Sequence, residues 1–428
     1  MANLKAAAKA TLQKVLDLKP VKALTLKATK TLAQTIVTPG ASYTISKPYD
    51  LAGSTLVLPH AVTLTITGSG SIANGTLVGD ASVIVAHGKV FTNVTLRGTW
   101  SCVGDVRWWA EGCDIPESDT NRYFIRDYRD ETDALQQALD SPFRELHFPP
   151  RPYYITRPLV LRQEKHLVLH GPGIRTSMED MTPSVRNTTI LFTNLNTPLL
   201  IISPEELNNE DNTYPVSITI EGGNFDVSRC YNYTSSCIKV MADDEQKIWG
   251  LHIRTTLHAF PKNTAVAIDI NPVENTACQL NQAFVTDIHI DSAIYNFDTA
   301  VVAHNYMNER TCQYYNWCTA LTIDGTIDGS RIAVVSNVEG TDVRALLQAG
   351  LFFDRQDNQQ PLVRYTGTRA AIASDIYDIQ LGGGNLWRNQ YALEVTNPSA
   401  VVTPYGTFAS FVTLSKRLGK TCVNGPLY

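Results

Sequence analysis

The sequence predicts an all-β protein built as a β-solenoid, in which successive turns of the chain stack their strands in parallel. Short segments rich in β-branched residues recur from residue 35 to the end of the chain. Polar turns separate them at intervals of roughly 10–25 residues. Irregular repetition of this kind is typical of solenoid coils with loops of variable length. The alternative, an antiparallel sandwich, would not accommodate so many strands in one domain.

The composition agrees with a large folded core and excludes other classes. Of the 428 residues, 43% are hydrophobic and 18% are charged, against roughly 25% charged in ordinary soluble domains. A disordered chain needs fewer apolar residues and a larger net charge. No apolar run reaches the length of about 18 residues that predicts a transmembrane helix, so no membrane partner is expected.

The charge is unevenly distributed along the chain. The net charge is −5, but residues 1–30 contain seven lysines and a single acid, Asp17, which gives this segment +6 and leaves −11 for the rest. An acidic body argues against nucleic acid as the main partner, because phosphate binding requires Lys and Arg. Apolar residues within 3–18 recur at helical spacing. This basic helix is predicted to be either an attachment peptide or a frayed tail.

These patterns divide the chain into three parts: a basic attachment or assembly segment at 1–34, a β-rich leader at 35–115 and the solenoid at 116–428. In the leader, Asn74-Gly75 and Gly79-Asp80 predict turns. Strands are predicted there at 55–58, 63–67, 83–85 and 94–97.

The solenoid is predicted to begin with a helix at 130–140, which Asp130 caps and Pro142 ends. Its strands are predicted at 167–169, 189–192, 199–202, 216–220, 250–254, 266–270, 285–290, 320–323 and 375–381.

The N-terminus lacks the continuous apolar stretch of a secretory signal. We therefore expect the protein to be made in a reducing cytoplasm and its eight cysteines to be free thiols. The closely spaced pairs Cys230/Cys237 and Cys312/Cys318 remain candidates for disulfides that form after release.

Three motifs in order carry a resemblance to a known family. Residues 130–138 (DETDALQQA) resemble its D-D-T-x-A-I-Q-x-A helix. Residues 146–150 (LHFPP), followed by 153–155 (YYI), are similar to its F-P-P-G-x-Y-x-I strand, with Arg151-Pro152 in place of the usual glycine. Residues 169–173 (LHGPG) are similar to its L-x-G-x-G coil. The family is that of the pectate-lyase-superfamily right-handed parallel β-helix proteins.

The leader segments 49–56 and 71–76 also resemble phage or prophage tailspike and fibre proteins of Bacteroidetes. The resemblance implies a right-handed parallel β-helix with a capping helix, often trimeric, that binds or degrades polysaccharide. Its motifs are structural and imply no reaction.

Catalysis, if present, would need a pair of carboxylates. Glycoside hydrolysis uses two of them about 5–5.5 Å apart for retention or about 6.5–9.5 Å apart for inversion. Lyase chemistry would instead combine Asp243 and Asp244 with Arg229 or Arg254. The alternative for every acid is a solvated turn. The candidate catalytic residues, all near turns in aromatic-rich stretches, are Asp226, Asp243, Asp244, Glu245, Asp298 and Glu309.

Aromatic residues beside amides are a clearer signal, because a flat ring covers the apolar face of a sugar while amides bind its hydroxyls. The same residues would equally suit a subunit interface. The candidate carbohydrate-binding residues are Tyr231, Tyr233, His304, Tyr306, Tyr314, Tyr315 and Trp317.

No metal or other cofactor is predicted. His252, His258 and His289 lie in or beside strands, and neither an H-E-x-x-H nor an H-x-H motif accompanies them. Histidines that are satisfied within the sheet are the expected explanation.

The leading functional hypothesis is a virion spike or fibre that recognises bacterial surface polysaccharide. It would be a homotrimer, made in the host cytoplasm and bound to other virion proteins through residues 1–34. The alternatives are a polysaccharide depolymerase, acting as a hydrolase or lyase, and a purely structural virion decoration.

Overall fold

The computed structural model describes residues 24–25, 31–113, 128–171, 188–204, 216–241, 247–260, 263–271, 283–308, 313–314, 316–349, 361–366, 369–372, 376–377, 391–395, 401–404, 413–417 and 422–423. Within them the chain is mainly β, and its strands form long parallel sheets, which confirms that part of the prediction. The chain divides into two compact units, Met1–Cys102 and Val103–Tyr428. The helix predicted at 3–18 lies outside the described residues.

The first unit holds a sheet of seven parallel strands among its described residues. A short helix, α2 (Leu32–Thr35), precedes most of them and begins with a capping box formed by Thr31 and Gln34. The strands overlap all four that the sequence predicts in the leader. They are β1 (Leu24–Thr25), β2 (Ser42–Ile45), β3 (Pro48–Asp50), β4 (Thr55–Val57), β5 (Thr63–Ile66), β6 (Ser71–Ala86) and β7 (Phe91–Trp100).

The turn predicted at Asn74-Gly75 is a bend within β6 rather than a break between strands. Asn74 and, in β7, Asn93 have φ angles of 53° and 55°, a conformation that asparagine tolerates better than most residues. The Asn93 side chain donates to Asn74 Oδ1 at 3.2 Å, and Asn74 donates to Asp50 Oδ2 at 3.2 Å. The side chains therefore link three neighbouring strands at one bend.

The second unit contains two parallel sheets. The larger has fifteen strands in the described residues: β8 (Gly104–Asp105), β9 (Glu145–Phe148), β10 (Pro152–Tyr154), β12 (Lys165–Leu169), β13 (Ile190–Phe192), β15 (Val216–Asp226), β17 (Lys247–His258), β19 (Ala283–Tyr295), β23 (Asn316–Ser330), β25 (Thr341–Val343), β26 (Leu346–Ala349), β28 (Arg369–Ile372), β29 (Ile376–Tyr377), β31 (Val401–Pro404) and β33 (Cys422–Val423).

The smaller has nine described strands: β11 (Leu159–Leu161), β14 (Leu200–Ile202), β16 (Ser236–Val240), β18 (Val266–Ile270), β20 (Thr299–Ala303), β24 (Ile332–Ser336), β27 (Pro361–Tyr365), β30 (Tyr391–Val395) and β32 (Thr413–Arg417).

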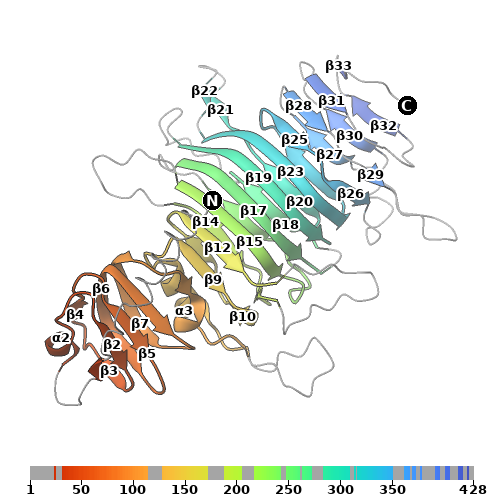
Figure 1. Cartoon of the computed structure of the whole chain (residues 1–428). Helices are drawn as coiled ribbons and strands as arrows, with labels where there is room; N and C mark the ends of the chain where they lie inside the picture. Colours follow the sequence, from red (N-terminus) through yellow and green to blue (C-terminus); the bar gives the residue numbers. More distant parts are fainter. Residues whose placement is uncertain are drawn as a thin grey trace, which may run out of the picture. The chain divides into compact units, whose positions relative to one another are not determined.

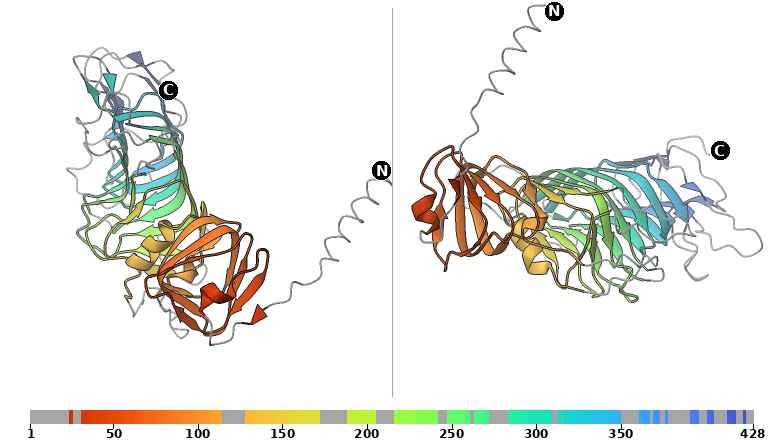
Figure 2. Two further views of the ribbon diagram at one scale, coloured as in Figure 1. Left: turned by 90° about the vertical axis from the view of Figure 1, so that its left-hand side faces the viewer. Right: turned by 60° about the horizontal axis from the view of Figure 1, so that its bottom comes forward.

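The chain alternates between these two sheets. It passes from β15 to β16, from β17 to β18, from β19 to β20 and from β23 to β24. In the larger sheet β17 pairs with β15, β19 with β17 and β23 with β19. In the smaller sheet β18 pairs with β16, β20 with β18 and β24 with β20. We call one such passage a repeat. Figures 1 and 2 show the strands of successive repeats side by side in chain order, from yellow to blue.

Columns of buried aliphatic side chains, which run from one repeat to the next, form the core. Ile220, Ile253, Ile290 and Ile323 occupy one register position in β15, β17, β19 and β23, and all are buried. Burying one such side chain contributes roughly 1.5–3 kcal/mol relative to leaving it exposed. Because the column holds only where residues pair in register, it also opposes a one-residue slip.

The helix predicted at 130–140 is present as α3 (Thr132–Leu139). Its N-cap residue is Glu131, which makes no capping hydrogen bond with its side chain. Asp130 instead accepts the Thr132 N–H at 3.0 Å. Leu135 lies on the buried face of α3, which packs beside β11.

The second unit begins at Val103 rather than at residue 116, where the sequence placed the boundary. The reason is that β8, at Gly104–Asp105, pairs with β9 and so belongs to the larger sheet. A 3-10 turn at Val106–Trp108 follows and buries Trp108. Among the described residues, no helix is long and apolar enough to cross a membrane.

A matched pair of glycine substitutions tests the register of the repeats. Gly325 has a φ of +89°, and a Cβ there would lie 2.3 Å from the Ser292 carbonyl oxygen of the preceding repeat. Gly340 has a φ of +74° but open space around it. We expect Gly340→Ala to cost about 1 kcal/mol of unfolding free energy and Gly325→Ala about 3 kcal/mol, because only the latter adds a clash. Equal unfolding midpoints in denaturant would contradict the pairing of Gly325 with Ser292.

Candidate functional site

The connections between the two sheets follow one another along one edge of the second unit. They comprise residues 227–235 after β15, 259–260 and 263–265 after β17, 296–298 after β19 and Arg331 after β23. We call this set the turn edge. Just before it, Asp226, His258, Tyr295 and Asp328 form one column in register. Several of the predicted site residues lie here.

Asp226 is a buried carboxylate that the local structure keeps ionised. Its Oδ1 accepts the Ser228 N–H at 2.8 Å and lies 3.7 Å from His258 Nδ1. Burial alone would raise the pKa of this carboxyl, but the interactions with His258 and Ser228 outweigh it and leave the pKa lowered. A carboxylate held in this form suits a structural ion pair better than proton donation.

Asp298 is also buried and is held by an ion pair across two repeats. Arg331 donates to it through Nε and Nη2, each at 2.7 Å. This bidentate geometry is the strongest form of a carboxylate–guanidinium contact. Asp298 therefore fixes the turn edge, and its oxygens are already engaged.

The register keeps these two carboxylates apart. Asp226 belongs to the repeat of β15, and Asp298 follows β19, two repeats further on. Neighbouring strands are about 4.8 Å apart, so the two lie about 10 Å or more from each other. This lies at or beyond the upper end of the range of about 6.5–9.5 Å that inverting hydrolysis of a glycoside uses, and well beyond the separation of about 5–5.5 Å in retaining hydrolysis.

Asp328 is a carboxyl that the sequence prediction did not include. Burial raises its pKa, and the Gly329 N–H offsets this only in part. A protonatable Asp328 and an ionised Asp226 would be suitable partners in acid–base catalysis. However, they stand three repeats apart in one column, roughly 14 Å.

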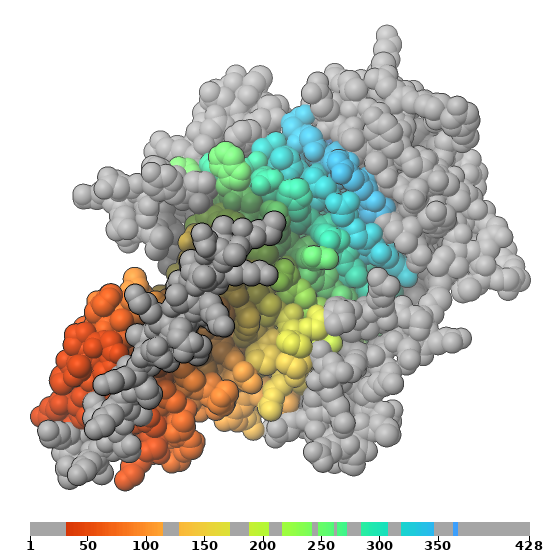
Figure 3. Space-filling view, viewed as in Figure 1, coloured from red at the N-terminus to blue at the C-terminus, as the bar shows by residue number. Residues whose placement is uncertain are grey.

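The turn edge presents two exposed aromatic rings. Tyr231 is 66% exposed and Phe260 41% exposed, and their ring centroids lie 4.7 Å apart in an edge-to-face arrangement. They come from consecutive repeats, so residues far apart in the sequence form one surface. Figure 3 shows residues of successive repeats as adjacent bands, from yellow to blue, on one face of the second unit.

The backbone around both rings is fixed by buried polar groups. Asn263 donates to the carbonyl oxygens of Phe260 and Asn296, each at 2.7 Å. The hydroxyl of Tyr233 donates to the Thr197 oxygen at 2.8 Å, which anchors the connection that carries Tyr231. A ligand would therefore meet rings that are already ordered, which lowers the entropy cost of binding.

Tyr233 lies in the core, with 0% of its surface exposed. Its hydroxyl is 3.1 Å from the Ser236 carbonyl oxygen as well, and burial raises its pKa. The ring has no face open to a sugar. Its hydroxyl anchors the connection that carries Tyr231, two residues earlier.

His304 and Tyr306 form a second place where predicted residues meet. Their rings are stacked, with centroids 5.8 Å apart and planes inclined by 20°. Both follow β20, at the opposite end of the smaller sheet from the turn edge. Burial lowers the pKa of His304, and the nearby charge of Asp269, which acts to raise it, offsets this only in part. The imidazole therefore favours the neutral form. Both rings are half-buried.

The predicted aromatic segment beyond Tyr306 includes an antiparallel hairpin. Its strands are β21 (Met307–Asn308) and β22 (Gln313–Tyr314), with Met307 opposite Tyr314. Figure 1 shows it beside the ends of the parallel strands. Trp317 lies in β23, opposite Phe284 of β19. The remaining predicted residues, Asp243, Asp244, Glu245, Glu309 and Tyr315, lie outside the described residues.

One cluster in the described residues has the composition of a metal site. It consists of His252 from β17 with Asp287 and His289 from β19, whose potential ligand atoms lie within 4.8 Å of one another. Its histidines are spaced too widely in sequence for a local motif to reveal them.

Comparisons with known proteins do not place the chain in a family. No family model matches the chain, and neither a curated protein nor a solved structure shows significant similarity to it.

Proposed function

We propose that this chain is a spike or fibre protein of a virion that recognises bacterial surface polysaccharide. In this proposal the second unit is a right-handed parallel β-helix with α3 as its capping helix, as the resemblance to the pectate-lyase superfamily implies. Support comes from parallel strands paired in register through successive repeats. Stacked repeats create long, rigid surfaces that suit an extended polymer.

The single observation that carries the proposal is the ring pair of Tyr231 and Phe260. Large exposed apolar groups are expected to have a partner when they are grouped and held rigid. The two rings are close together and stand on ordered connections. Arg229 in the same connection adds a polar group, whose Nη1 donates to the Tyr128 hydroxyl at 3.0 Å. Rings with polar neighbours match the two faces of a sugar.

The described carboxylates favour binding over cleavage. Asp226 lies 3.7 Å from His258, Asp298 forms an ion pair with Arg331, and the repeat spacing separates the two carboxylates by about 10 Å or more. A depolymerase would therefore have to use other acids. Binding to the polysaccharide without its cleavage is the expected activity.

Two partner proposals complete this function. Residues 1–34, which carry the positive charge of the N-terminus, would bind acidic surfaces of other virion proteins. A homotrimer would present three copies of the ring pair to one polysaccharide, and the effective concentration of linked sites would raise the apparent affinity.

The test is to incubate the full-length protein with capsules purified from candidate host bacteria. We expect Tyr231→Ala and Phe260→Ala each to weaken binding about tenfold, which corresponds to about 1.4 kcal/mol. Trp249→Ala is the matched control, since Trp249 is 59% exposed on β17, away from the turn edge. Isothermal titration measures the affinities, and size-exclusion chromatography with light scattering checks the oligomeric state.

The outcomes separate the alternatives. New reducing ends with ultraviolet absorbance of an unsaturated uronate would identify a lyase, and reducing ends alone a hydrolase. Loss of the oligomer in Tyr231→Ala would assign the rings to a subunit interface. Capsules that neither bind nor are cleaved would leave the structural decoration as the surviving hypothesis.

A further inference from the structure

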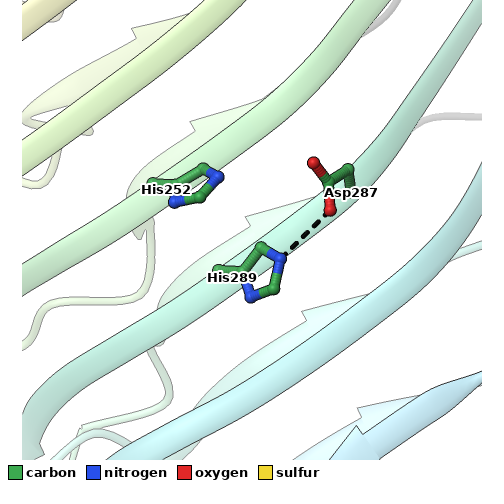
Figure 4. Close-up of side chains that lie close together, drawn as sticks. All are labelled: His252, Asp287 and His289. Carbon is green, nitrogen blue, oxygen red and sulfur yellow. Dashed lines mark hydrogen bonds and ion pairs between the residues drawn. The ribbon is translucent and has the colours of Figure 1, made fainter.

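His252, Asp287 and His289 converge on the outer face of the larger sheet (Figure 4). His252 lies directly opposite His289 in the register of β17 and β19. Their ring centroids are 4.8 Å apart, with planes inclined by 34°. His289 Nε2 is 3.1 Å from Asp287 Oδ1. All three side chains remain accessible, because His252 is exposed and the other two are half-exposed.

The backbone places the carboxylate beside the histidine pair. Asp287 has a φ of 57°, a left-handed conformation that aspartate, like asparagine, adopts more readily than most residues because its short polar side chain can hydrogen-bond locally. Gly250 and Ala320 also have positive φ at the corresponding bend in β17 and β23. A Cβ on Gly250 would lie 4.0 Å from Asp287 Oδ2, so the carboxylate reaches toward β17, which also carries His252. The bend thus aims Asp287 at the histidine pair.

The nearest charged residues along these strands pair with each other and not with this cluster. Two residues further along the same strands, Arg254 and Asp291 neutralise each other, with Nε and Oδ2 at 3.4 Å. In the described residues, Asp287 has His289 as its hydrogen-bond partner, and no hydrogen bond occupies the imidazole nitrogens of His252. Thr219 and Thr322 flank the two histidines in the adjacent strands.

We propose that His252, Asp287 and His289 bind a divalent transition-metal ion. Two imidazoles and one carboxylate are a common ligand set for zinc and for iron(II), with the remaining positions open. The 3.1 Å contact between His289 and Asp287 is close to the separation of two ligands on one zinc ion, since each bond is about 2.0–2.2 Å. A rotation of His252 would bring in the third ligand.

The ion would join β17 to β19 and so link two repeats through side chains. Water would complete its coordination at the exposed side. This site stands apart from the turn edge, at which the ring pair lies, and the inference does not depend on polysaccharide binding. The absence of a local H-x-H motif explains why the sequence did not predict it, since its two histidines come from different repeats.

Zinc titration of the full-length, tag-free, metal-stripped protein tests the site. We expect one Zn²⁺ to bind by isothermal calorimetry and to raise the thermal unfolding midpoint. His252→Ala, His289→Ala and Asp287→Asn should each weaken binding at least tenfold. Asn tolerates the left-handed backbone, so Asp287→Asn removes a strong ligand without added strain. His60→Ala is the control, because His60 pairs with Asp80 at 3.2 Å but lacks a second histidine.

Cobalt(II) provides a second readout, since its visible absorption reports coordination by nitrogen and oxygen ligands. The wild-type and His60→Ala proteins should give the same spectrum, and the three cluster variants should lose it. Circular dichroism confirms that each variant is folded. Zinc affinity that is unchanged in all three folded variants, or no zinc binding by the wild-type protein, would overturn the proposal.

Discussion

The Leu135→Asp variant is expected to be insoluble or to unfold far below the temperature of the wild-type protein. Leu135 has no exposed surface and lies on the face of α3 that packs beside β11. A carboxylate placed there would lose its hydration without gaining a partner, at a cost of several kcal/mol. An uncovered end of a parallel sheet would also expose unpaired strand edges, which favour aggregation.

Gln137→Asp is the matched control for this experiment. It introduces the same charge into the same helix, but at a position that is only partly buried. We expect it to remain soluble, with an unfolding midpoint close to that of the wild-type protein. Soluble expression and differential scanning calorimetry measure both variants. A soluble Leu135→Asp protein with wild-type stability would show that α3 does not protect the core.

Asp298→Ala is expected to destabilise the second unit by about 3 kcal/mol. The substitution leaves Arg331 without its bidentate partner, and breaking a buried pair on one side typically costs about 3–5 kcal/mol. The lower value applies because the Arg331 side chain is 24% exposed. The measurement is the free energy of unfolding in urea.

The double variant Asp298→Ala/Arg331→Ala provides the control. If the two side chains act as a pair, the double variant should be no less stable than Asp298→Ala. A double-mutant cycle with Asp298→Ala, Arg331→Ala and the double variant should then show a coupling energy between the two side chains. If Asp298→Ala instead kept its stability and abolished cleavage of a polysaccharide, Asp298 would be catalytic. That result would contradict the structural role assigned to it.

The strands were predictable because each repeat has a strong local pattern. The segment 266–270 was predicted to the residue as β18, and β15, β17 and β19 contain the predicted cores. Their observed lengths exceed the prediction, since bends such as the one at Asp287 join two short segments into a longer strand. Positive φ at an aspartate has no sequence signature, so the bend could not be anticipated.

The site could be predicted only in part, because the contacts that form it join separate repeats. Tyr231 was recognised as an aromatic residue in a turn, but Phe260 was not, since nothing local relates the two. Tyr233 stands in the same stretch of sequence as Tyr231, but its side chain is buried. The pairing of His252 with His289 likewise depends on the register of β17 and β19. Loop lengths set that register, and these could not be assigned to repeats from the sequence.

Hydroxyl-radical footprinting of the protein with and without bound capsule tests the central claim most directly. Aromatic side chains react readily with the radical when they are exposed, and mass spectrometry locates the oxidised residues. The proposed function predicts that polysaccharide protects Tyr231 and Phe260, whereas Trp249, exposed on the face of β17, stays reactive. Protection of Trp249 with unchanged oxidation of Tyr231 and Phe260 would contradict the assignment of the turn edge as the binding surface.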